Sequence, residues 1–227
     1  MNRHPLKKIS IFALLKKIKK LNLGNEKILL EDSKGRFLAK DIISKINLPP
    51  FKNSAVDGYA LFKEDVLKEN KNLIFNQRIA AGDKDSVNLK KGQAARIFTG
   101  AKMPRNSQTV VMQENVILVK NKIKIKKMPR YGENCRLSGE DIAKGNKVLS
   151  SGDRVNLKNI NLIAAIGKKD IFVKRKISIG FFTSGNELKD PTEKLKGSEI
   201  NNSNYYSLKA LLDDPYIKSS YLGILKD

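Results

Sequence analysis

The chain has 227 residues, which is enough for one or two domains, and its 40% hydrophobic content is enough for a real core. No apolar run approaches the roughly 18 residues that a transmembrane helix needs, so we expect no membrane partner. The single cysteine, Cys135, excludes an internal disulfide and fits a reducing, cytoplasmic location. With one histidine, His4, a Cys/His zinc site and a Ser-His-Asp triad are not expected, nor is a flavin or a nicotinamide.

The formal net charge of +22 suits a polyanionic partner at first sight. Lysine supplies most of this charge, whereas nucleic-acid grooves usually add arginine forks and stacking aromatic rings. Aromatic residues are only 7% of the chain and tryptophan is absent. We therefore interpret the lysines as solvent-facing residues and expect no nucleic-acid partner. A basic nucleic-acid-binding protein is the less favoured alternative.

The first predicted elements precede residue 47. Apolar residues at helical spacing predict an amphipathic N-terminal helix that packs on the protein; these are Ile11, Leu14, Leu15, Ile18 and Leu21. A helix lying on a membrane surface is the less favoured interpretation of the same pattern. A strand at Lys27–Leu30 and a helix around Lys34–Ile46 follow.

The middle of the chain predicts mainly β-structure. Pro49-Pro50 stops any helix and forces an extended entry into a segment rich in turn formers. Residues 71–137 hold short apolar runs broken by turn dipeptides. Val116–Val119 and Ile123–Ile125 alternate about Lys120-Asn121, which predicts a β-hairpin.

The last part of the chain predicts the start of an α/β domain. After a helix at Leu157–Ile166 and a strand at Ile171–Val173, a buried strand is expected at Ile177–Phe182. Ser203-Asn204 is expected to cap a helix at Tyr205–Leu212, and Tyr221–Leu225 is expected to be the next strand. Strand, helix and strand open a parallel α/β domain. Because two strands cannot complete such a sheet, we expect this domain to be incomplete in the chain.

Four polar loops carry residues that strands and helices do not need. They contain Asp57, then Thr99, then Arg136 with Glu140 and Asp141, and finally Glu187 beyond the carboxyl end of a strand. Each has a structural alternative. Asp57-Gly58 is a common hairpin turn, the adjacent carboxylates can cap or form ion pairs, and Ser203-Asn204 can be a simple helix cap. These residues alone indicate oxygen-rich loops suited to magnesium and a phosphate.

Five sequence strings add a resemblance to a known family. LPPFKNSAVDGYA, RIFTGAKMP, GENCRLSGEDI, IGFFTSGNEL and GSEINNSNYYSLKALL occur in the order and near the spacing of motifs in the molybdopterin molybdenumtransferase family. That family includes the MoeA proteins and the E domain of gephyrin. The resemblance covers nearly the whole chain. Two departures are Lys52 and Asn186, each of which stands where the family motif has an aspartate.

The resemblance implies an α/β multidomain fold. Residues 1–46 and 138–176 would form one elongated mixed α/β domain, with a mostly-β domain, residues 47–137, inserted between them. Residues 177–227 would form an incomplete α/β domain of the molybdopterin-adenylyltransferase type. Family members form homodimers whose active site lies between the α/β domain of one chain and the β domain of the other.

The resemblance also implies a reaction, in which molybdenum from molybdate enters adenylylated molybdopterin, AMP is released and Mg²⁺ is required. Carried over by motif, Asp57, Thr99, Asp141 and Glu187 would be catalytic, with Asp57 and Glu187 also binding the metal. Arg136, Ser203 and Asn204 would bind substrate, although Arg136 and Asp141 can instead position the β domain. The molybdopterin adenylyltransferase is a further implied partner. The alternative is a non-catalytic dimerisation or scaffold form, and we expect little insertion activity from the 227 residues alone.

Overall fold

The computed structural model describes residues 22–69, 71–83 and 87–226. The N-terminal helix expected at residues 11–21 lies outside this part of the chain. The described residues form two compact units. The first combines residues 22–40, 151–160 and 169–226, and the second combines residues 41–150 and 161–168. Within the described residues, no helix is long and apolar enough to cross a membrane.

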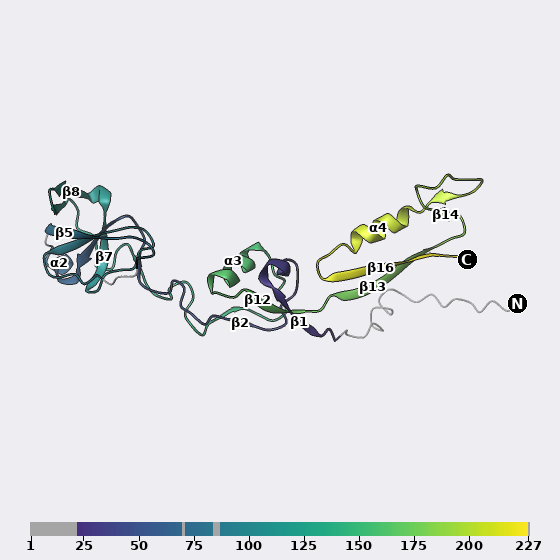
Figure 1. Ribbon diagram of the computed structural model, residues 1–227, viewed down its shortest axis with the longest axis horizontal. Coiled ribbons are helices and arrows are strands. Elements are labelled where there is room, and N and C mark those ends of the chain that lie inside the picture. The colour runs from purple at the N-terminus through teal and green to yellow at the C-terminus, as the bar shows by residue number, and fades with distance from the viewer. Residues whose placement is uncertain (1–21, 70, 84–86, 227) are drawn as a thin grey trace. The chain divides into compact units, whose positions relative to one another are not determined.

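The structure consists of short strands with few helices, and Figure 1 labels most of the longer elements. The strands are β1 (Asn25–Leu29), β2 (Ile42–Ile43), β3 (Asn53–Ser54), β4 (Gly58–Phe62), β5 (Asn72–Ile79), β6 (Gln93–Ile97), β7 (Ser107–Met112), β8 (Val116–Val119), β9 (Lys122–Ile125), β10 (Cys135–Arg136), β11 (Lys147–Leu149), β12 (Asp170–Lys174), β13 (Ile177–Ser184), β14 (Leu188–Lys189), β15 (Ile200–Asn201) and β16 (Ile217–Leu225). The helices are α2 (Lys63–Leu67), α3 (Leu157–Ala165) and α4 (Ser203–Leu211), with 3₁₀ turns η1 (Leu30–Ser33) and η2 (Gln113–Asn115).

The second unit is built on a six-stranded sheet with the order β7-β4-β6-β5-β9-β8. Only the β5–β6 pair is parallel. Alternate residues of β4 belong to two separate apolar clusters, because Tyr59 and Leu61 pack in one and Ala60 packs in the other. This central strand is therefore covered on both faces, which explains why its sequence, GYALF, is apolar rather than alternating.

The predicted β-hairpin is confirmed. β8 and β9 pair in antiparallel fashion, and Val119 faces Lys122 across the Lys120-Asn121 loop. Lys120 has a φ of 55°, in the left-handed region that such tight loops use. The hairpin forms one edge of the six-stranded sheet.

The first unit contains the strand, helix and strand expected from residue 177 onward. β13 and β16 are parallel, and α4 connects them and lies along the pair (Figure 1). The helix begins at Ser203, two residues before the expected start. The second strand is also longer than expected, because it begins at Ile217 rather than Tyr221.

The helix expected around Lys34–Ile46 is wrong. Gly35 has a φ of 79°, which is incompatible with a helix, and the following backbone pairs with distant segments instead. Leu38 N donates to Asp153 O at 2.9 Å, and Lys174 N donates to Phe37 O at 2.8 Å. Leu38 is fully buried. Tertiary hydrogen bonds therefore override the local helical pattern.

Segments from before residue 47 pair with segments from after residue 137. β1 pairs with β12 in the first unit, and β2 pairs with β11 in the second unit. These pairings agree with a domain made from two separated segments. The two compact units have boundaries that differ from those of the predicted domains. The assignment of residues 1–46, 47–137, 138–176 and 177–227 to three domains therefore stays a prediction.

Candidate functional site

The candidate site in the second unit is centred on Asp57 and Thr99. The backbone N–H and the hydroxyl group of Thr99 both donate to Asp57 Oδ1, each at 2.8 Å. Asp57 immediately precedes β4, and Thr99 follows β6. Because Gly58 pairs with Ile97 across these antiparallel strands, the two loops must meet at this end of the sheet. Both side chains are accessible to solvent.

A tight turn after β6 aims Thr99 at the carboxylate. Ala101 N donates to Phe98 O at 2.9 Å, and Gly100 has a φ of 79°. A positive φ at the third residue of a turn is the geometry that favours glycine there. Thr99 therefore occupies the second turn position, from which its N–H and hydroxyl reach Asp57.

Hydrogen bonds from Thr99 favour the ionised form of Asp57. The pKa of Asp57 lies below its ordinary value, first because of the Thr99 backbone N–H, then because of the Thr99 hydroxyl, with a smaller effect from the Arg96 charge. Both hydrogen bonds from Thr99 go to the same oxygen of Asp57, Oδ1. Among the described residues, Oδ2 has no hydrogen-bond partner, so the site presents one free carboxylate oxygen.

The interpretation of Asp57-Gly58 as a hairpin turn is wrong. Gly58 is the first residue of β4 and has no positive φ. A Cβ atom at Gly58 would lie 2.0 Å from Val111 O on the neighbouring strand β7. Glycine is required here because two backbones approach closely, and this approach fixes the position of Asp57.

The three sequence motifs that contain Asp57, Thr99 and Arg136 come together in the second unit. β3 pairs with β10, so Ser54 faces Cys135 and Asn53 faces Arg136. Asn53 also forms a bridge with Lys102 from the Thr99 loop. Ser54 is buried, and its Oγ donates to Val56 O at 2.6 Å, which shapes the bend before Asp57. Burial raises the pKa of the Cys135 thiol, which disfavours the thiolate.

The third motif is held together by its own ion pairs. Arg136 Nε donates to Glu140 Oε1 at 2.6 Å, and Arg136 Nη2 donates to both carboxylate oxygens of Asp141 at 2.7 and 2.6 Å. The hydrogen bond from Arg136 is the main cause that lowers the pKa of Glu140. Leu137 N also donates to Glu140. Arg136 and Asp141 therefore satisfy each other, and this geometry favours a positioning role for both over direct contact with substrate.

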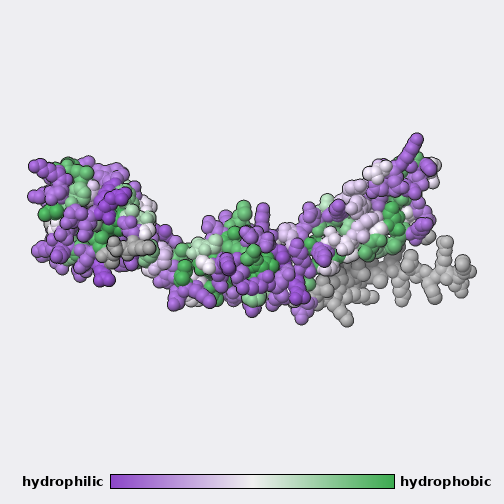
Figure 2. Space-filling model, in the orientation of Figure 1, coloured by the Kyte–Doolittle hydropathy of each residue, from purple (hydrophilic) through white to green (hydrophobic). Residues whose placement is uncertain are grey.

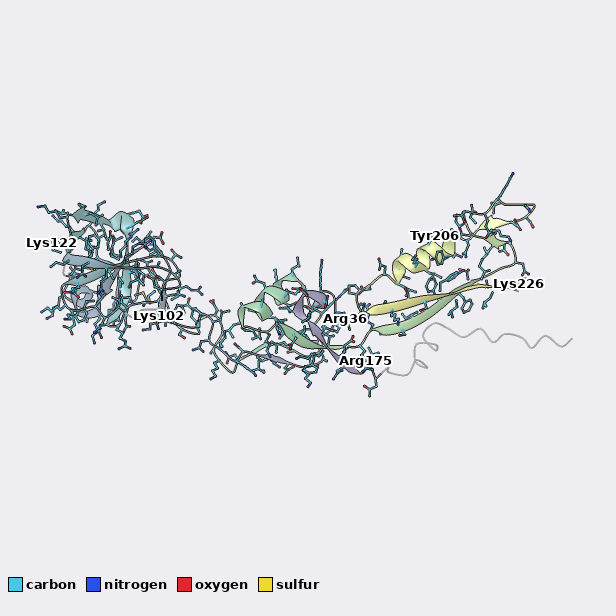
Figure 3. The ribbon with its side chains drawn as sticks, in the orientation of Figure 1. Arg36, Lys102, Lys122, Arg175, Tyr206 and Lys226 are labelled. Carbon is cyan, nitrogen blue, oxygen red and sulfur yellow. The ribbon has the colours of Figure 1, made fainter. Side chains whose placement is uncertain are left out.

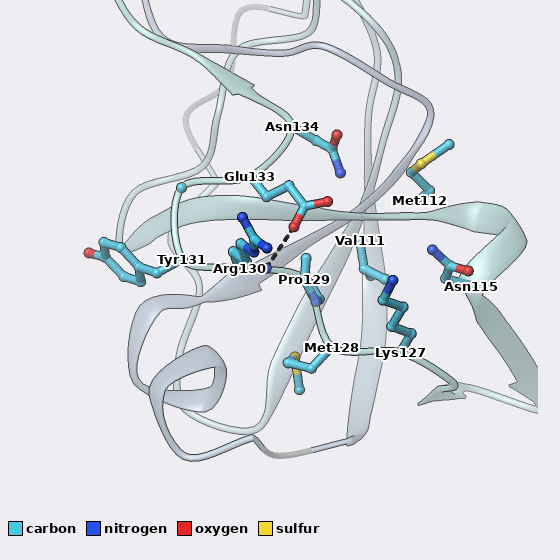
Figure 4. Close-up of a pocket in the computed structure, with 11 residues that line it drawn as sticks. Val111, Met112, Asn115, Lys127, Met128, Pro129, Arg130, Tyr131, Glu133 and Asn134 are labelled. Carbon is cyan, nitrogen blue, oxygen red and sulfur yellow. Dashed lines mark hydrogen bonds between the residues drawn. The ribbon is translucent and has the colours of Figure 1, made fainter.

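A pocket of about 640 Å³ lies beside this site and was not predicted from the sequence (Figure 4). It lies between the end of β7 and the loop before β10. Met112, on its wall, pairs with Gly58, and the adjacent Gln113 N donates to Asp57 O at 3.2 Å. Figure 4 shows Lys127 and Arg130 among the residues around it. The volume is within the range of small-molecule sites.

Glu187 lies in the first unit, whereas Asp57 lies in the second. It sits in the turn between β13 and β14, and its carboxylate oxygens lie 2.6 and 2.8 Å from the place where a Cβ of Gly185 would be. Gly185 has a φ of 142°. Ile200 N donates to Glu187 O at 2.9 Å, which links this turn to β15. The side chain is exposed at the carboxyl end of β13, where it was expected.

The predicted cap of α4 is wrong by one residue. Asn202 is the N-cap, because its side chain accepts from Tyr205 N at 3.3 Å. The Asn202 amide also donates to Thr183 Oγ1 at 2.9 Å and to the Tyr221 hydroxyl at 3.1 Å. Asn202 is buried, whereas Ser203 and Asn204 are exposed on the first turn. The signal was available, because asparagine ranks at least as high as serine at N-caps.

No cluster of three or more histidine, cysteine, aspartate or glutamate side chains that could hold a metal occurs in residues 22–69, 71–83 and 87–226. Asp57 and Glu187 are each single carboxylates. Such donors suit Mg²⁺, which is commonly bound by one or two carboxylates together with water and substrate phosphates.

Comparisons with known proteins agree with the motifs. Residues 8–167 match the family model of the MoeA N-terminal region, which covers domains I and II. The molybdopterin molybdenumtransferase of Haemophilus influenzae is 33% identical over 199 residues, covering 87% of this chain and 49% of the relative. The protein of the same name from Nostoc is 36% identical, covering 85% of this chain and 45% of the relative.

Solved structures show the same relationship. A molybdopterin biosynthesis MoeA protein from Pyrococcus horikoshii aligns with a TM-score of 0.83 at 31% identity, covering 90% of this chain and 55% of that one. This chain spans about half the length of the curated relatives named above. The family match covers well over half of the chain, and the chain belongs to the MoeA N-terminal family.

Proposed function

We propose that this chain functions in molybdenum cofactor biosynthesis, where it helps to insert molybdenum from molybdate into adenylylated molybdopterin with release of AMP. The observation that carries the proposal is the Asp57–Thr99 pair, formed where the first two family motifs meet. The names of the relatives support the reaction class. The sequence motifs around Glu187 and Ser203 support a contribution from the first unit.

The residues of the chain have distinct tasks in this proposal. Thr99 holds Asp57 ionised and fixed, which leaves Oδ2 for a substrate group or a metal-bound water. Arg136 and Asp141 hold the neighbouring loop. Glu187 is an exposed carboxylate of the first unit, and its sequence motif supports a catalytic role for it. The exposed first turn of α4, including Ser203 and Asn204, offers polar groups at a helix N-terminus to an anionic part of the substrate.

Mg²⁺ fits this donor set. Asp57 and Glu187 are the residues that would hold it, with water and substrate phosphate oxygens as the remaining ligands. When bound, Mg²⁺ would screen the negative charge of the phosphate that is cleaved. We also propose a homodimer, on the basis of the family architecture, and light scattering at micromolar concentrations should give twice the monomer mass. Binding to a molybdopterin adenylyltransferase is a further proposed interaction.

The test is release of AMP from adenylylated molybdopterin in the presence of molybdate and Mg²⁺. The gene product that contains this chain is compared with its Asp57→Asn and Glu187→Gln variants. Glu31→Gln is the matched control, because Glu31 is an exposed carboxylate on η1. We expect each site variant to lose at least about tenfold in rate, corresponding to about 1.4 kcal/mol of transition-state stabilisation, and the control to keep the wild-type rate.

Full activity of both site variants would contradict the proposal. The non-catalytic alternative predicts something different, namely no AMP release by any variant but an intact dimer. The 227-residue chain is assayed in parallel, and we expect it to turn over at less than about a tenth of the rate of a protein that spans the full length of the curated relatives, because residues that act as one constellation are strongly non-additive.

A further inference from the structure

The two edges of the six-stranded sheet differ. At the β7 edge, a loop covers the backbone, because Val110 N donates to Glu133 O at 3.1 Å and the Asn134 side chain donates to Val110 O at 2.9 Å. At the other edge, β8 pairs only with β9. In the described part of the chain, no further strand covers the outer side of β8, and the bond from Val116 N to Gln113 O of η2 is the one backbone hydrogen bond made there. This edge is therefore open.

The hydrogen-bond pattern indicates which backbone groups face outward. Lys126 N donates to Asn115 O at 2.9 Å, so Asn115–Lys126 is a hydrogen-bonded pair that continues the β8–β9 ladder, and the pair Val119–Lys122 that closes the loop lies an even number of residues away. In antiparallel pairs, the backbone groups of the intervening residues point away from the partner strand. Leu118 therefore presents its N–H and C=O groups at the open edge, and Val116 presents its C=O group, because Val116 N already donates to Gln113 O at the end of η2.

The side chains of β8 are unusually exposed for apolar residues. Ile117, Leu118 and Val119 are 46%, 56% and 56% exposed. Their faces alternate along the strand, since Leu118 pairs with the buried Ile123 while Ile117 pairs with Lys124. Proteins usually protect an open edge with charge, proline or a covering segment. Here, three consecutive exposed apolar residues leave hydrophobic surface on both faces of the open edge strand.

The surroundings of this edge are strongly positive. Residues 114–127 contain one acid, Glu114, and five lysines: Lys120, Lys122, Lys124, Lys126 and Lys127. No ion pair within the described residues neutralises these lysines. In Figure 3, Lys122 lies at the outer margin of this unit, on the opposite side from Lys102, which belongs to the Thr99 loop. The loop end of the hairpin is therefore separate from the candidate site, whereas Lys127, at its other end, also lines the pocket beside that site.

We propose that β8 binds an extended, acidic segment of another protein by strand addition. Such a segment satisfies the free N–H and C=O groups, buries the apolar side chains on alternate faces and places carboxylates beside the lysines. A lipid surface cannot pair with an open sheet edge. RNA readers use stacking rings, and this hairpin has none. A second copy of the chain would bring lysines against lysines.

The probe is a fluorescein-labelled peptide of three Glu-Val repeats, titrated with the full 227-residue chain and followed by fluorescence anisotropy. We expect saturable binding. A peptide with N-methyl groups on alternate amides should not bind, because it cannot pair with the strand. A Glu-Gly repeat carries the same charge without apolar side chains and should bind at least about tenfold more weakly, which corresponds to about 1.4 kcal/mol.

The protein variants test the same surface. Lys122→Glu/Lys124→Glu should weaken binding at least about tenfold, since two attractions become repulsions. Leu118→Pro removes an outward N–H group and should weaken binding similarly. The matched control is Lys63→Glu/Lys68→Glu at α2, which packs against β4 and β7, the strands at the opposite end of the strand order from β8. The control should bind within about twofold of wild type, and circular dichroism melting shows whether each variant folds.

Several results would overturn the proposal. One is equal binding of the N-methylated peptide, and another is equal affinity of the Lys122→Glu/Lys124→Glu variant. Vesicles of phosphatidylserine or single-stranded RNA that bind through these lysines while the peptide does not would assign the surface to another partner. Self-association lost on Leu118→Pro would assign it to a second copy. None of these measurements depends on AMP release, so the binding proposal and the proposed reaction fail separately.

Discussion

Replacing Gly58 with alanine tests whether close backbone contact between β4 and β7 positions the site. The added Cβ would lie 2.0 Å from Val111 O and 3.0 Å from Val110 Cγ1. A carbon atom needs at least about 3 Å from a carbonyl oxygen, so the two strands must separate by about 1 Å. Backbone cannot move aside as a flexible side chain can, and both Val110 and Val111 are buried.

The cost of Gly58→Ala can be worked out from this displacement. Overpacking a buried site costs about 1–3 kcal/mol. A shift of about 1 Å also breaks β4–β7 hydrogen bonds next to Gly58, each worth about 1 kcal/mol net. We therefore expect the free energy of unfolding of this unit to fall by about 3–5 kcal/mol. Asp57, the preceding residue, should lose its register with Thr99.

Gly92→Ala is the matched control in the same unit. A Cβ at Gly92 meets nothing within 4 Å, but its φ of 79° makes alanine strained by about 1–2 kcal/mol. Urea unfolding followed by circular dichroism, with hydrogen exchange measured on peptides covering β4 and β7, separates the two variants. If Gly58→Ala costs no more than Gly92→Ala and leaves exchange in β7 unchanged, the close-contact argument is refuted.

Two further predictions concern single side chains. Asn202→Ala removes the α4 cap together with the hydrogen bonds from its amide to Thr183 and Tyr221, so we expect about 2–4 kcal/mol of destabilisation and faster hydrogen exchange in α4. Ser203→Ala should change stability by less than about 0.5 kcal/mol. The pKa of Asp57 is depressed, so its contribution to stability is present above its unfolded pKa, near 3.8, and is lost as the pH falls through the lower folded value. Thr99→Val keeps the backbone donor and removes the hydroxyl, so a carbon-13 titration of the Asp57 carboxyl should show a higher pKa; an unchanged pKa would mean that the hydroxyl does not act on it.

Local patterns predicted the regular elements well. The hairpin at β8 and β9 follows from alternation about Lys120-Asn121, and β13, α4 and β16 follow from their order and periodicity. These elements are stabilised by contacts near in sequence or by simple strand pairing. The wrong helix around Lys34–Ile46 shows the limit of this reasoning. Most of its backbone hydrogen bonds go to residues more than 100 positions away, and no local pattern contains them.

The site residues were predictable, but their geometry was not. Asp57 and Thr99 were both identified from their loops, yet their contact depends on the register that pairs Gly58 with Ile97. The close approach at Gly58 depends on β7, which lies about 50 residues further along the chain. Asn202 was missed because the adjacent Ser203 is also a good cap, and only the tertiary hydrogen bonds from Asn202 to Thr183 and Tyr221 distinguish the two residues.

The division into units gives a last prediction about how the site residues couple. Thr99 fixes Asp57 entirely within the second unit, while Gly185 and Glu187 form their turn entirely within the first. The Asp57–Thr99 pair and the Gly185–Glu187 turn are therefore each held in place by contacts within one unit. The effects of Thr99→Val and Glu187→Gln on stability and hydrogen exchange should consequently add. If both sets act on one substrate, their effects on AMP release should not add, because the second loss acts on a constellation already disabled. A double-mutant cycle tests both statements. The two single variants and the double variant are made in the gene product that contains this chain, and their stability and their rate of AMP release are measured. Additive losses in rate would show that Asp57 and Glu187 do not serve one reaction. Coupled losses in stability would show that the two units do not organise these residues independently.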